Sequence, residues 1–450
     1  MKKLGLIFLV LIMCAGMVAG CKPEEKAEAV DLGGREVKYF SQTDGIDPRA
    51  YEAAKDTPTY EKDVARIEQL EKDFNCKIKV VTYNDFDATH KNFLTAMAAG
   101  SPPADVINND SALGYPTYMV NMYLEPLNDY FDVYDSNDGV WDARFSKGGE
   151  WNGKVYMVTP KREMHPTNIM LFNKRIFSES SELKEYDLYQ LVKDKQWTWD
   201  KMREIAMKAT KDLDNDGKTD QMGVAGQGLT GSIFNNALVV SNGCHYITDV
   251  DGKKTFDINE QGMKALEFTF KLAWTDRCYG VEMPYDDWLG AMDNWQRGNV
   301  ALFVTETYKA YDYKKIMTAD KFGALPIPIG PDMTEYVTER SKNEIVGIIA
   351  GCQDPEKVAK LTEAIFKRPE WAISLADAIE KNFFDEESVN IIVELAQNPT
   401  FTFYQGYEKL LGLFIWGTNG LYDKVPPATY YAENYQIVQD DIDRMWMLNA

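Results

Sequence analysis

Strand and helix patterns alternate through the first part of the chain, and this alternation restricts the fold more than any other feature. Residues 36–41 alternate in polarity as a strand does, and residues 59–74 repeat apolar side chains at helical spacing. A strand over 77–82, a helix over 88–99 and a strand over 105–107 follow. The order β-α-β-α-β predicts a largely parallel sheet with helices on both faces, and ligands of such sheets bind beyond the carboxyl ends of the strands.

Polar residues follow each of these three strands. They are Gln42, Thr43 and Asp44 after the first strand, Asn84 after the second, and Asn108, Asn109 and Asp110 after the third. Such residues also form turns in any α/β protein, so each one is either a ligand contact or a turn former. We expect them to lie together at one edge of the sheet, facing a ligand.

A second α/β unit follows farther along the chain. Its strongest local signal is Thr198, a predicted N-cap before a helix whose apolar residues include Met202 and Ile205. The other predicted elements are strands at 169–172, 300–304 and 321–329 and helices at 263–274, 288–296 and 356–366, with a mainly helical remainder. About 415 residues exceed the ~250–300 that one core serves, which predicts two lobes.

The amino terminus is typical of an export signal. Lys2 and Lys3 precede an apolar run at 4–13, which is too short to span a bilayer. Val18-Ala19-Gly20-Cys21 resembles a lipobox, in which residues 1–20 are removed and Cys21 carries a diacylglyceryl group; the alternative is a plain secretory signal with a chance cysteine. The polar segment 21–34 would then be a flexible tether that holds the protein on the outer face of the cytoplasmic membrane.

Charge and cysteine usage exclude several classes of function. The chain has a formal net charge of −21, and loss of Lys2 and Lys3 leaves 47 basic against 70 acidic residues. Such a surface repels nucleic acid and anionic lipid. Four scattered cysteines, Cys76, Cys244, Cys278 and Cys352, have no zinc-binding spacing, and the sequence leaves open whether they form disulfides.

One segment has the spacing of a calcium-binding loop. Asp212, Asp214, Asp216 and Asp220 occupy positions one, three, five and nine, glycine occupies position six, and Lys218 stands at position seven, which contributes a backbone carbonyl in such loops. The acid usual at position twelve is replaced by Gly223. We therefore expect either a weak structural Ca²⁺ site or a solvated acidic turn.

Several short strings, in this order, resemble the extracellular solute-binding proteins of ABC importers, in the sugar-binding group that includes the maltose receptor. The strings are Gly153-Lys-Val-Tyr156, Leu171-Phe-Asn-Lys174, Thr198-Trp-Asp200, Ser241-Asn-Gly243, Asp251-Gly-Lys253, Arg297-Gly-Asn-Val-Ala-Leu302 and Asp354-Pro-Glu356. Each string alone is weak, and the signal comes from their shared order over nearly the whole mature chain.

The resemblance implies a two-lobed α/β fold of the periplasmic-binding-protein type, with hinge strands that cross between the lobes and a ligand cleft between them. It implies crossings near 160–166 and 304–308. The first lobe would comprise 35–162 and 305–352, and the second lobe 163–304 and 353–450.

The resemblance also implies ligand contacts outside the first three strands. These are Arg162 and Glu163 at the first crossing, Glu306 and Tyr308 at the second, and Phe234 and Asn235 in a loop at 231–235. We expect Tyr308 and Trp416 to offer aromatic faces to a sugar ring, although Trp416 lies in an apolar run and core packing is an equal alternative.

The function implied is that of a monomeric receptor that closes its lobes on a mono- or oligosaccharide and delivers it to an ABC permease. Peptide, polyol or polyanion ligands stay open. The alternative is a secreted carbohydrate-active hydrolase; the sequence contains no HExxH or GxSxG motif, and chance carboxylate pairs are common among 70 acidic residues.

Overall fold

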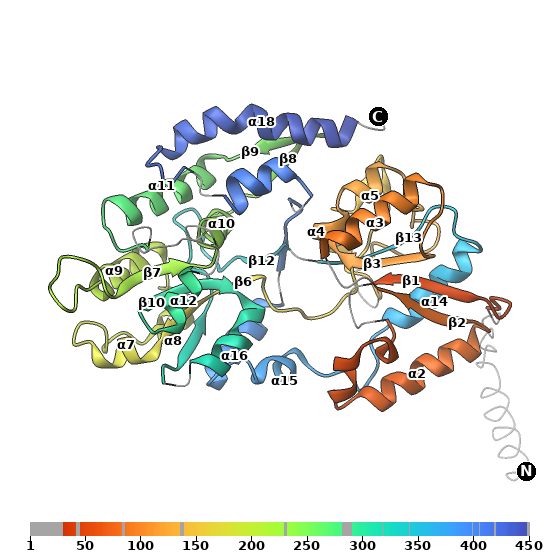
Figure 1. The fold of residues 1–450 in the computed structure, drawn as a ribbon, viewed down its shortest axis with the longest axis horizontal. Helices are drawn as coiled ribbons and strands as arrows, with labels where there is room; N and C mark the ends of the chain where they lie inside the picture. Colours follow the sequence, from red (N-terminus) through yellow and green to blue (C-terminus); the bar gives the residue numbers. More distant parts are fainter. Residues whose placement is uncertain are drawn as a thin grey trace, which may run out of the picture.

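The computed structural model describes residues 30–41, 46–82, 86–135, 139–228, 232–280, 290–317, 319–341, 343–397, 399–404, 406–417 and 420–447. These residues form two α/β lobes that lie side by side (Figure 1). Predictions for the signal segment and for Cys21, Gln42, Thr43, Asp44 and Asn84 fall outside the described residues. No described helix has both the length and the apolar character needed to cross a membrane.

The first lobe is built on a sheet with the strand order β13-β3-β1-β2. Strands β1, β2 and β3 are parallel, as predicted, and β13 joins β3 in the antiparallel sense. The elements of this lobe are β1 (Glu36–Ser41), η1 (Pro48–Ala50), η2 (Glu52–Asp56), α2 (Tyr60–Asp73), β2 (Lys77–Val81), α3 (Phe86–Ala98), β3 (Val106–Asp110), α4 (Ser111–Gly114), α5 (Thr117–Val120), α6 (Ala143–Ser146), β4 (Glu150–Trp151), β5 (Lys154–Val155), β13 (Glu344–Ile348) and α14 (Pro355–Phe366).

The second lobe is built on a sheet with the order β11-β6-β10-β7. β6 runs antiparallel to both of its neighbours, β11 and β10, whereas β10 and β7 pair in the parallel sense. Its elements are β6 (Asn168–Asn173), α7 (Lys174–Glu179), α8 (Leu188–Lys193), α9 (Trp199–Ala209), β7 (Met222–Gly226), α10 (Ser232–Ser241), β8 (Tyr246–Val250), β9 (Lys253–Asp257), α11 (Glu260–Trp274), α12 (Gly290–Gln296), β10 (Val300–Glu306), η4 (Thr307–Lys309), α13 (Ala310–Ile316), β11 (Phe322–Leu325), β12 (Thr338–Arg340), α15 (Leu375–Glu380), α16 (Glu386–Leu395), β14 (Pro399–Phe401), α17 (Glu408–Leu410), the π-helical turn η5 (Leu411–Ile415) and α18 (Pro427–Met447).

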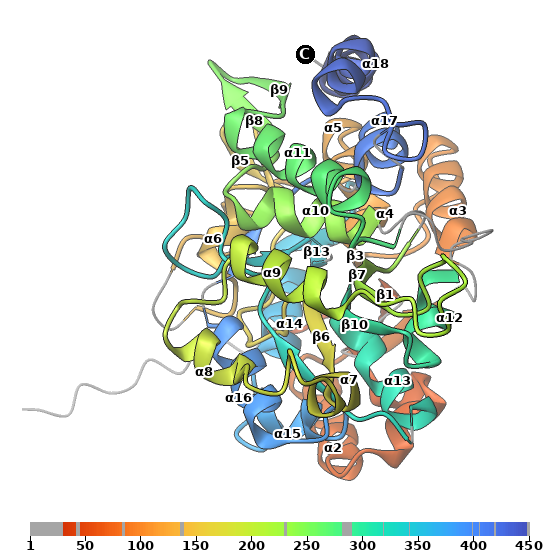
Figure 2. The same cartoon turned by 90° about the vertical axis from the view of Figure 1, so that its left-hand side faces the viewer.

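Both faces of the second sheet are covered by helices, because successive side chains of a strand point to opposite faces. Ile169 and Leu171 of β6 pack with side chains of α12 and α13, whereas Met170 and Phe172 pack with those of α9. Figure 2 shows α12 and α13 on one side of this sheet and α9 on the other. Every residue of β6 is buried, which explains its continuous apolar pattern.

Helix α9 shows how local sequence signals build an element. Its N-cap is Thr198, whose hydroxyl accepts a hydrogen bond from the backbone N–H of Lys201 at 3.3 Å. Met202 and Ile205 are buried one turn apart on the face toward the sheet. The predicted cap and apolar stripe are both confirmed.

The chain passes between the lobes three times: over 161–167 (first crossing), between β12 and β13 (second crossing) and over 367–374 (third crossing). The first two crossings run side by side, since the Thr167 N–H donates to the Glu339 carbonyl oxygen at 2.9 Å. In Figure 1 these segments join the two lobes at the centre of the molecule.

The predicted crossing at 304–308 is wrong. Strand β10 stays in the second sheet through Glu306, where it pairs with Asn168, and the chain then returns to the same sheet as β11, which pairs Phe322 with Asn173. Sheet membership therefore places α13 and β11 in the second lobe. Helix α14 packs against α2 and β13 and so belongs to the first lobe. The prediction places 305–352 in the first lobe and 353–450 in the second, so α13, β11 and α14 each lie in the lobe opposite to the predicted one.

Aromatic rings also join the lobes. Phe403, which follows β14 of the second lobe, lies 5.3 Å from Tyr115 and 5.2 Å from Phe145 of the first lobe between ring centroids. Its ring packs directly on Gly148, where a Cβ would lie only 2.0 Å from the ring. The apolar core is consequently continuous between the lobes. Cys76, Cys244, Cys278 and Cys352 form no disulfide.

Candidate functional site

The first-lobe wall of the candidate site is the carboxyl end of β3. We predicted that Asn108, Asn109 and Asp110 follow the strand, and this is wrong, because β13 pairs with β3 as far as Asp110 and extends the strand through all three residues. Asn108 is buried; it accepts a hydrogen bond from the Ser41 hydroxyl at 2.9 Å and donates one to the Glu344 carboxylate at 2.7 Å. These bonds fix the amide between two strands of the sheet.

The neighbouring residues on β3 have different roles. Asp110 is the N-cap of α4, where its carboxylate accepts a hydrogen bond from the Ala112 N–H at 2.9 Å. Asn109 is fully buried, and among the described residues neither of its side-chain polar atoms has a hydrogen-bond partner. An unsatisfied buried amide is uncommon in folded proteins, and a bound ligand group or a water can account for one.

A group of five charged and polar side chains, which we call the hinge cluster, lies where the crossings meet the first lobe. Its members are Asn108, Asp110, Arg162, Arg340 and Glu344. Arg162 of the first crossing forms an ion pair with the buried Glu344 carboxylate. Arg340 is buried at the end of β12 and donates to the His165 carbonyl oxygen at 2.6 Å.

The charged members of the hinge cluster act on the Arg340 guanidinium. Burial lowers the pKa of the Arg340 guanidinium to about 10, and the positive charge of Arg162 acts in the same direction. The carboxylates of Asp110 and Glu344 oppose this effect. The hinge cluster thus brings two arginines from the crossings against two acids of the first lobe.

Two further predicted contacts, Glu306 and Tyr308, lie in the second lobe at the end of β10 and in η4. The buried Glu306 carboxylate accepts hydrogen bonds from the Gln227 amide at 2.9 Å and the Tyr308 hydroxyl at 3.1 Å. Burial and the Glu306 carboxylate raise the pKa of Tyr308, so its hydroxyl stays a donor at neutral pH. The Tyr308 side chain is 49% exposed, and Lys309 lies 5.1 Å from its ring centroid.

Three other predicted contacts lie in different surroundings. The expected contact loop at 231–235 is instead the first turn of α10 from Ser232 onward. Phe234 is fully buried there with its ring 4.8 Å from that of Tyr279, and Asn235 is buried beside it. Trp416 ends the π-helical turn and is 39% exposed. In this conformation solvent does not reach Phe234, and its contact with a ligand stays a prediction.

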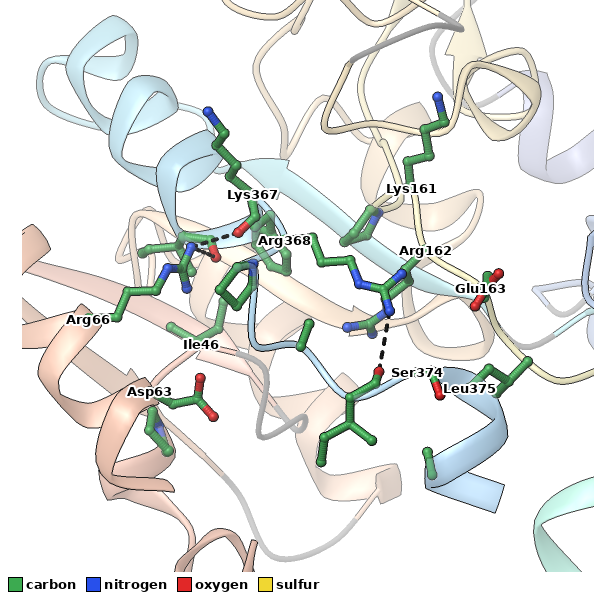
Figure 3. Close-up of a pocket in the computed structure, with 18 of the residues that line it drawn as sticks. Ile46, Asp63, Arg66, Lys161, Arg162, Glu163, Lys367, Arg368, Ser374 and Leu375 are labelled. Atoms are coloured by element: carbon green, nitrogen blue, oxygen red, sulfur yellow. Dashed lines mark hydrogen bonds between the residues drawn. The ribbon is translucent and has the colours of Figure 1, made fainter. Parts of the chain in front are cut away.

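A pocket of about 340 Å³, the interlobe pocket, lies between the lobes at the first and third crossings (Figure 3). Of the predicted site residues, Arg162 and Glu163 line it. The other polar lining residues are Asp63 and Arg66 from α2, Lys161 from the first crossing, and Lys367, Arg368 and Ser374 from the third crossing. Sequence reasoning missed these, because their segments are about 300 positions apart and carry no shared motif.

The predicted metal-binding loop lies in the second lobe between α9 and β7. Carboxylate oxygens of Asp212, Asp214 and Asp216 all lie within 4.8 Å of one another, and all three residues are exposed. Asp220 does not join them: its carboxylate accepts hydrogen bonds from the backbone N–H groups of Leu213 at 2.7 Å and Asp214 at 3.3 Å. Lys218 donates its N–H to Asp216 at 2.8 Å.

Solved structures with the same two-lobed fold include several binding proteins. UspC from M. tuberculosis has a TM-score of 0.63 at 15% identity, over 90% of this chain and 100% of its own. The maltose-binding protein MalE from Listeria monocytogenes, in complex with maltose, has a TM-score of 0.60 at 14% identity, and the match covers 91% of this chain and 98% of MalE. An ABC substrate-binding protein from the same species, in complex with cycloalternan, has a TM-score of 0.58 at 15% identity, and the match covers 91% of this chain and 98% of that protein.

The family assignment comes from sequence. No curated protein matches the chain in sequence. The model of the bacterial extracellular solute-binding protein family matches residues 53–367, which cover the chain from α2 to α14, including the whole second sheet and the first two crossings. Because this match covers more than half of the chain, the chain belongs to the bacterial extracellular solute-binding proteins.

Proposed function

We propose that this protein captures a mono- or oligosaccharide between its lobes and delivers it to an ABC permease. The observation that carries the proposal is the interlobe pocket, to which both lobes and two crossings contribute side chains. A solute held there touches both lobes, so its binding free energy depends on the angle between them. Its volume lies in the range of small-molecule sites, which is about 300–1,000 Å³.

The chemistry of the walls suits a saccharide. Sugar hydroxyls are recognised by paired hydrogen bonds from carboxylates, amides and guanidinium groups, and the interlobe pocket is lined by Asp63, Glu163 and Arg162. Sugar rings also stack on aromatic faces; Phe366 lines the pocket, whereas the half-exposed Tyr308 of the second lobe is not part of its lining. Three of the structures with this fold hold maltose, cycloalternan and mannotriose, which supports a saccharide as the ligand class.

We further propose that Cys21 carries a lipid anchor and that residues 21–34 tether the lobes to the outer face of the cytoplasmic membrane. The lipobox-like string and the extracellular family support this. The mass of the amino-terminal peptide of the mature protein would show the acyl chains directly, and an unmodified Cys21 would contradict the anchor.

The receptor proposal predicts ligand-induced stabilisation without turnover. We expect at least one saccharide in a panel containing maltose, maltotriose and mannotriose to raise the melting temperature of residues 22–450. A hundredfold excess over Kd contributes about 2.7 kcal/mol, or roughly 3 °C in a chain of this size. Recovery of intact saccharide by chromatography distinguishes a receptor from a hydrolase. No response to any saccharide would contradict the proposal, and so would consumption of the bound one.

We propose that the loop at Asp212–Asp220 binds Ca²⁺ in a structural role, because three converging carboxylates supply the hard oxygen ligands that this ion prefers. Adding 1 mM CaCl₂ after EGTA is expected to raise the melting temperature by about 1–2 °C, as a site with Kd near 10⁻⁴ M would. Asp214→Asn should abolish the shift and Asp423→Asn, an exposed acid elsewhere, should keep it. A shift that survives Asp214→Asn would contradict the site.

A further inference from the structure

The interlobe pocket differs in charge from the chain that forms it. The whole sequence has 49 basic and 70 acidic residues, yet five basic side chains line the pocket against two carboxylates among the described residues. The basic residues are Arg66, Lys161, Arg162, Lys367 and Arg368, and the acidic ones are Asp63 and Glu163. A concave surface of one sign raises the local concentration of ligands of the opposite sign.

Two of the five cations are committed to the protein's own groups. Arg66 donates to the carbonyl oxygens of Ile365 at 2.7 Å and Lys367 at 2.9 Å, and so caps the carboxyl end of α14. Arg162 pairs with Glu344. The Asp63 carboxylate accepts a hydrogen bond from the Trp371 indole at 2.8 Å and stays on its own side of the pocket.

Arg368 is not committed in this way. Its guanidinium donates a hydrogen bond to the Ile373 carbonyl oxygen at 3.3 Å, and among the described residues no carboxylate forms an ion pair with it or with Lys367. In Figure 3 the side chains of Arg162 and Arg368 extend toward each other from the first and third crossings. Glu344 compensates the charge of Arg162 alone, so the two guanidinium groups together keep one positive charge in excess, which an anion between them would neutralise.

We propose that the solute is an acidic saccharide whose carboxylate binds between Arg162 and Arg368. This inference rests on the proposed saccharide receptor and names its substrate class. Arginine presents a planar pair of donors that matches a carboxylate, and two arginines from two crossings would hold one carboxylate from both sides. Because the crossings join the lobes, the carboxylate would bind at the place where the angle between the lobes is set.

The test compares uronic acids with their uncharged esters. Isothermal titration calorimetry is run with trimers of galacturonate, glucuronate and mannuronate, with the methyl esters of the same trimers, with maltotriose and with sodium phosphate, each at 50 and 300 mM NaCl. We expect one uronate trimer to bind at least about tenfold more tightly than its own ester, since a charge-assisted pair is lost in the ester. Its affinity should fall at higher salt.

Variants of Arg368 connect this preference to the pocket. Arg368→Gln should reduce the ratio of acid to ester affinity by about tenfold, and Arg368→Lys should reduce it less, because charge is kept while the paired donors are lost. Arg297→Gln removes an exposed arginine of the second lobe that lines no part of the pocket, and it should leave the ratio unchanged. Arg368 is exposed, so both variants should fold, which circular dichroism checks.

The other possible results of these titrations would contradict either the carboxylate site or the receptor function itself. Equal affinity for acid and ester, or equal ratios in the Arg368→Gln and Arg297→Gln variants, would overturn the carboxylate site. Binding of phosphate without any uronate would also overturn it, because the site would then take a free anion. Binding of maltotriose alone would keep the receptor and overturn only this inference, whereas no binding of any saccharide would remove the proposed function itself.

Discussion

Replacing Arg162 with methionine is expected to lower the free energy of unfolding by about 3 kcal/mol and to weaken ligand binding at least about tenfold. The side chain of Glu344 is only 3% exposed, and Arg162 is its ion-pair partner. Removing the arginine leaves a buried carboxylate without that partner, which costs more than the pair itself contributes to stability. Urea denaturation measures the first effect, and calorimetry with the saccharide found by the thermal-shift screen measures the second.

Two matched variants separate these effects. Arg203 pairs with Asp276 in the second lobe at 2.6 Å, and the Asp276 side chain is 5% exposed, so Arg203→Met should cost similar stability without changing ligand affinity. The double variant Arg162→Met with Glu344→Gln removes the buried charge and should recover most of the stability but none of the binding. If Arg162→Met and Arg203→Met affected ligand affinity equally, the hinge cluster would have no part in the site.

The sequence predicts those parts of the fold that depend on neighbours along the chain. Helix α9 has its cap and its buried face within a dozen residues, so Thr198 and Met202 are enough to place it. The parallel order of β1, β2 and β3 follows equally from their alternation with helices. These elements carry local signals, and such signals do not depend on the rest of the molecule.

The parts that failed depend on partners far away in sequence. Asn108, Asn109 and Asp110 look like a polar loop, but β13 pairs with them from more than 230 positions away, and its Glu344 satisfies the buried Asn108 amide. The course of the chain after β10 depends on the pairing of β11 with β6. Hydrophobic periodicity identifies a strand but not the distant strand that pairs with it, so neither the β3–β13 pairing nor the β6–β11 pairing could be predicted from the sequence.

Part of the candidate site, but not all of it, could be predicted from the sequence. Arg162 and Glu163 were singled out because the family resemblance marks the first crossing, and both line the interlobe pocket. Arg368 has no such mark, since it sits in an irregular segment between α14 and α15 and reaches the pocket only through the third crossing. A charged residue in a loop is usually a solvated one, and only the fold shows what it faces.

Glu339, at the second crossing, is expected to have the largest effect on stability of any single acidic residue that we describe. Its carboxylate is buried and accepts hydrogen bonds from Asn168 at 3.0 Å, Thr402 at 3.1 Å, Asn236 and Tyr404. Glu339→Ala leaves these buried donors without an acceptor, each at a cost of about 1–3 kcal/mol, so we expect a total loss of about 4 kcal/mol or more. A loss below about 1.5 kcal/mol in urea denaturation would contradict this account.

The same residue gives a pH dependence of known sign. Burial raises the pKa of the Glu339 carboxyl, although its four hydrogen bonds act in the opposite direction. A carboxyl with a raised pKa in the folded state contributes stability below its unfolded pKa of about 4.3, and this contribution is lost as the pH rises through the folded value. Glu339→Gln is uncharged throughout, so it lacks this loss.

The comparison of interest is therefore the difference in unfolding free energy between Glu339→Gln and the wild type, measured at pH 5 and at pH 8. We expect the difference to move in favour of the variant by more than about 1 kcal/mol as the pH rises, because only the wild type must then bury a charge. The many exposed acids titrate equally in both proteins and cancel in the difference. A difference that is constant between pH 5 and 8 would mean that the hydrogen bonds of Asn168, Asn236, Thr402 and Tyr404 fully offset the burial of the Glu339 carboxylate.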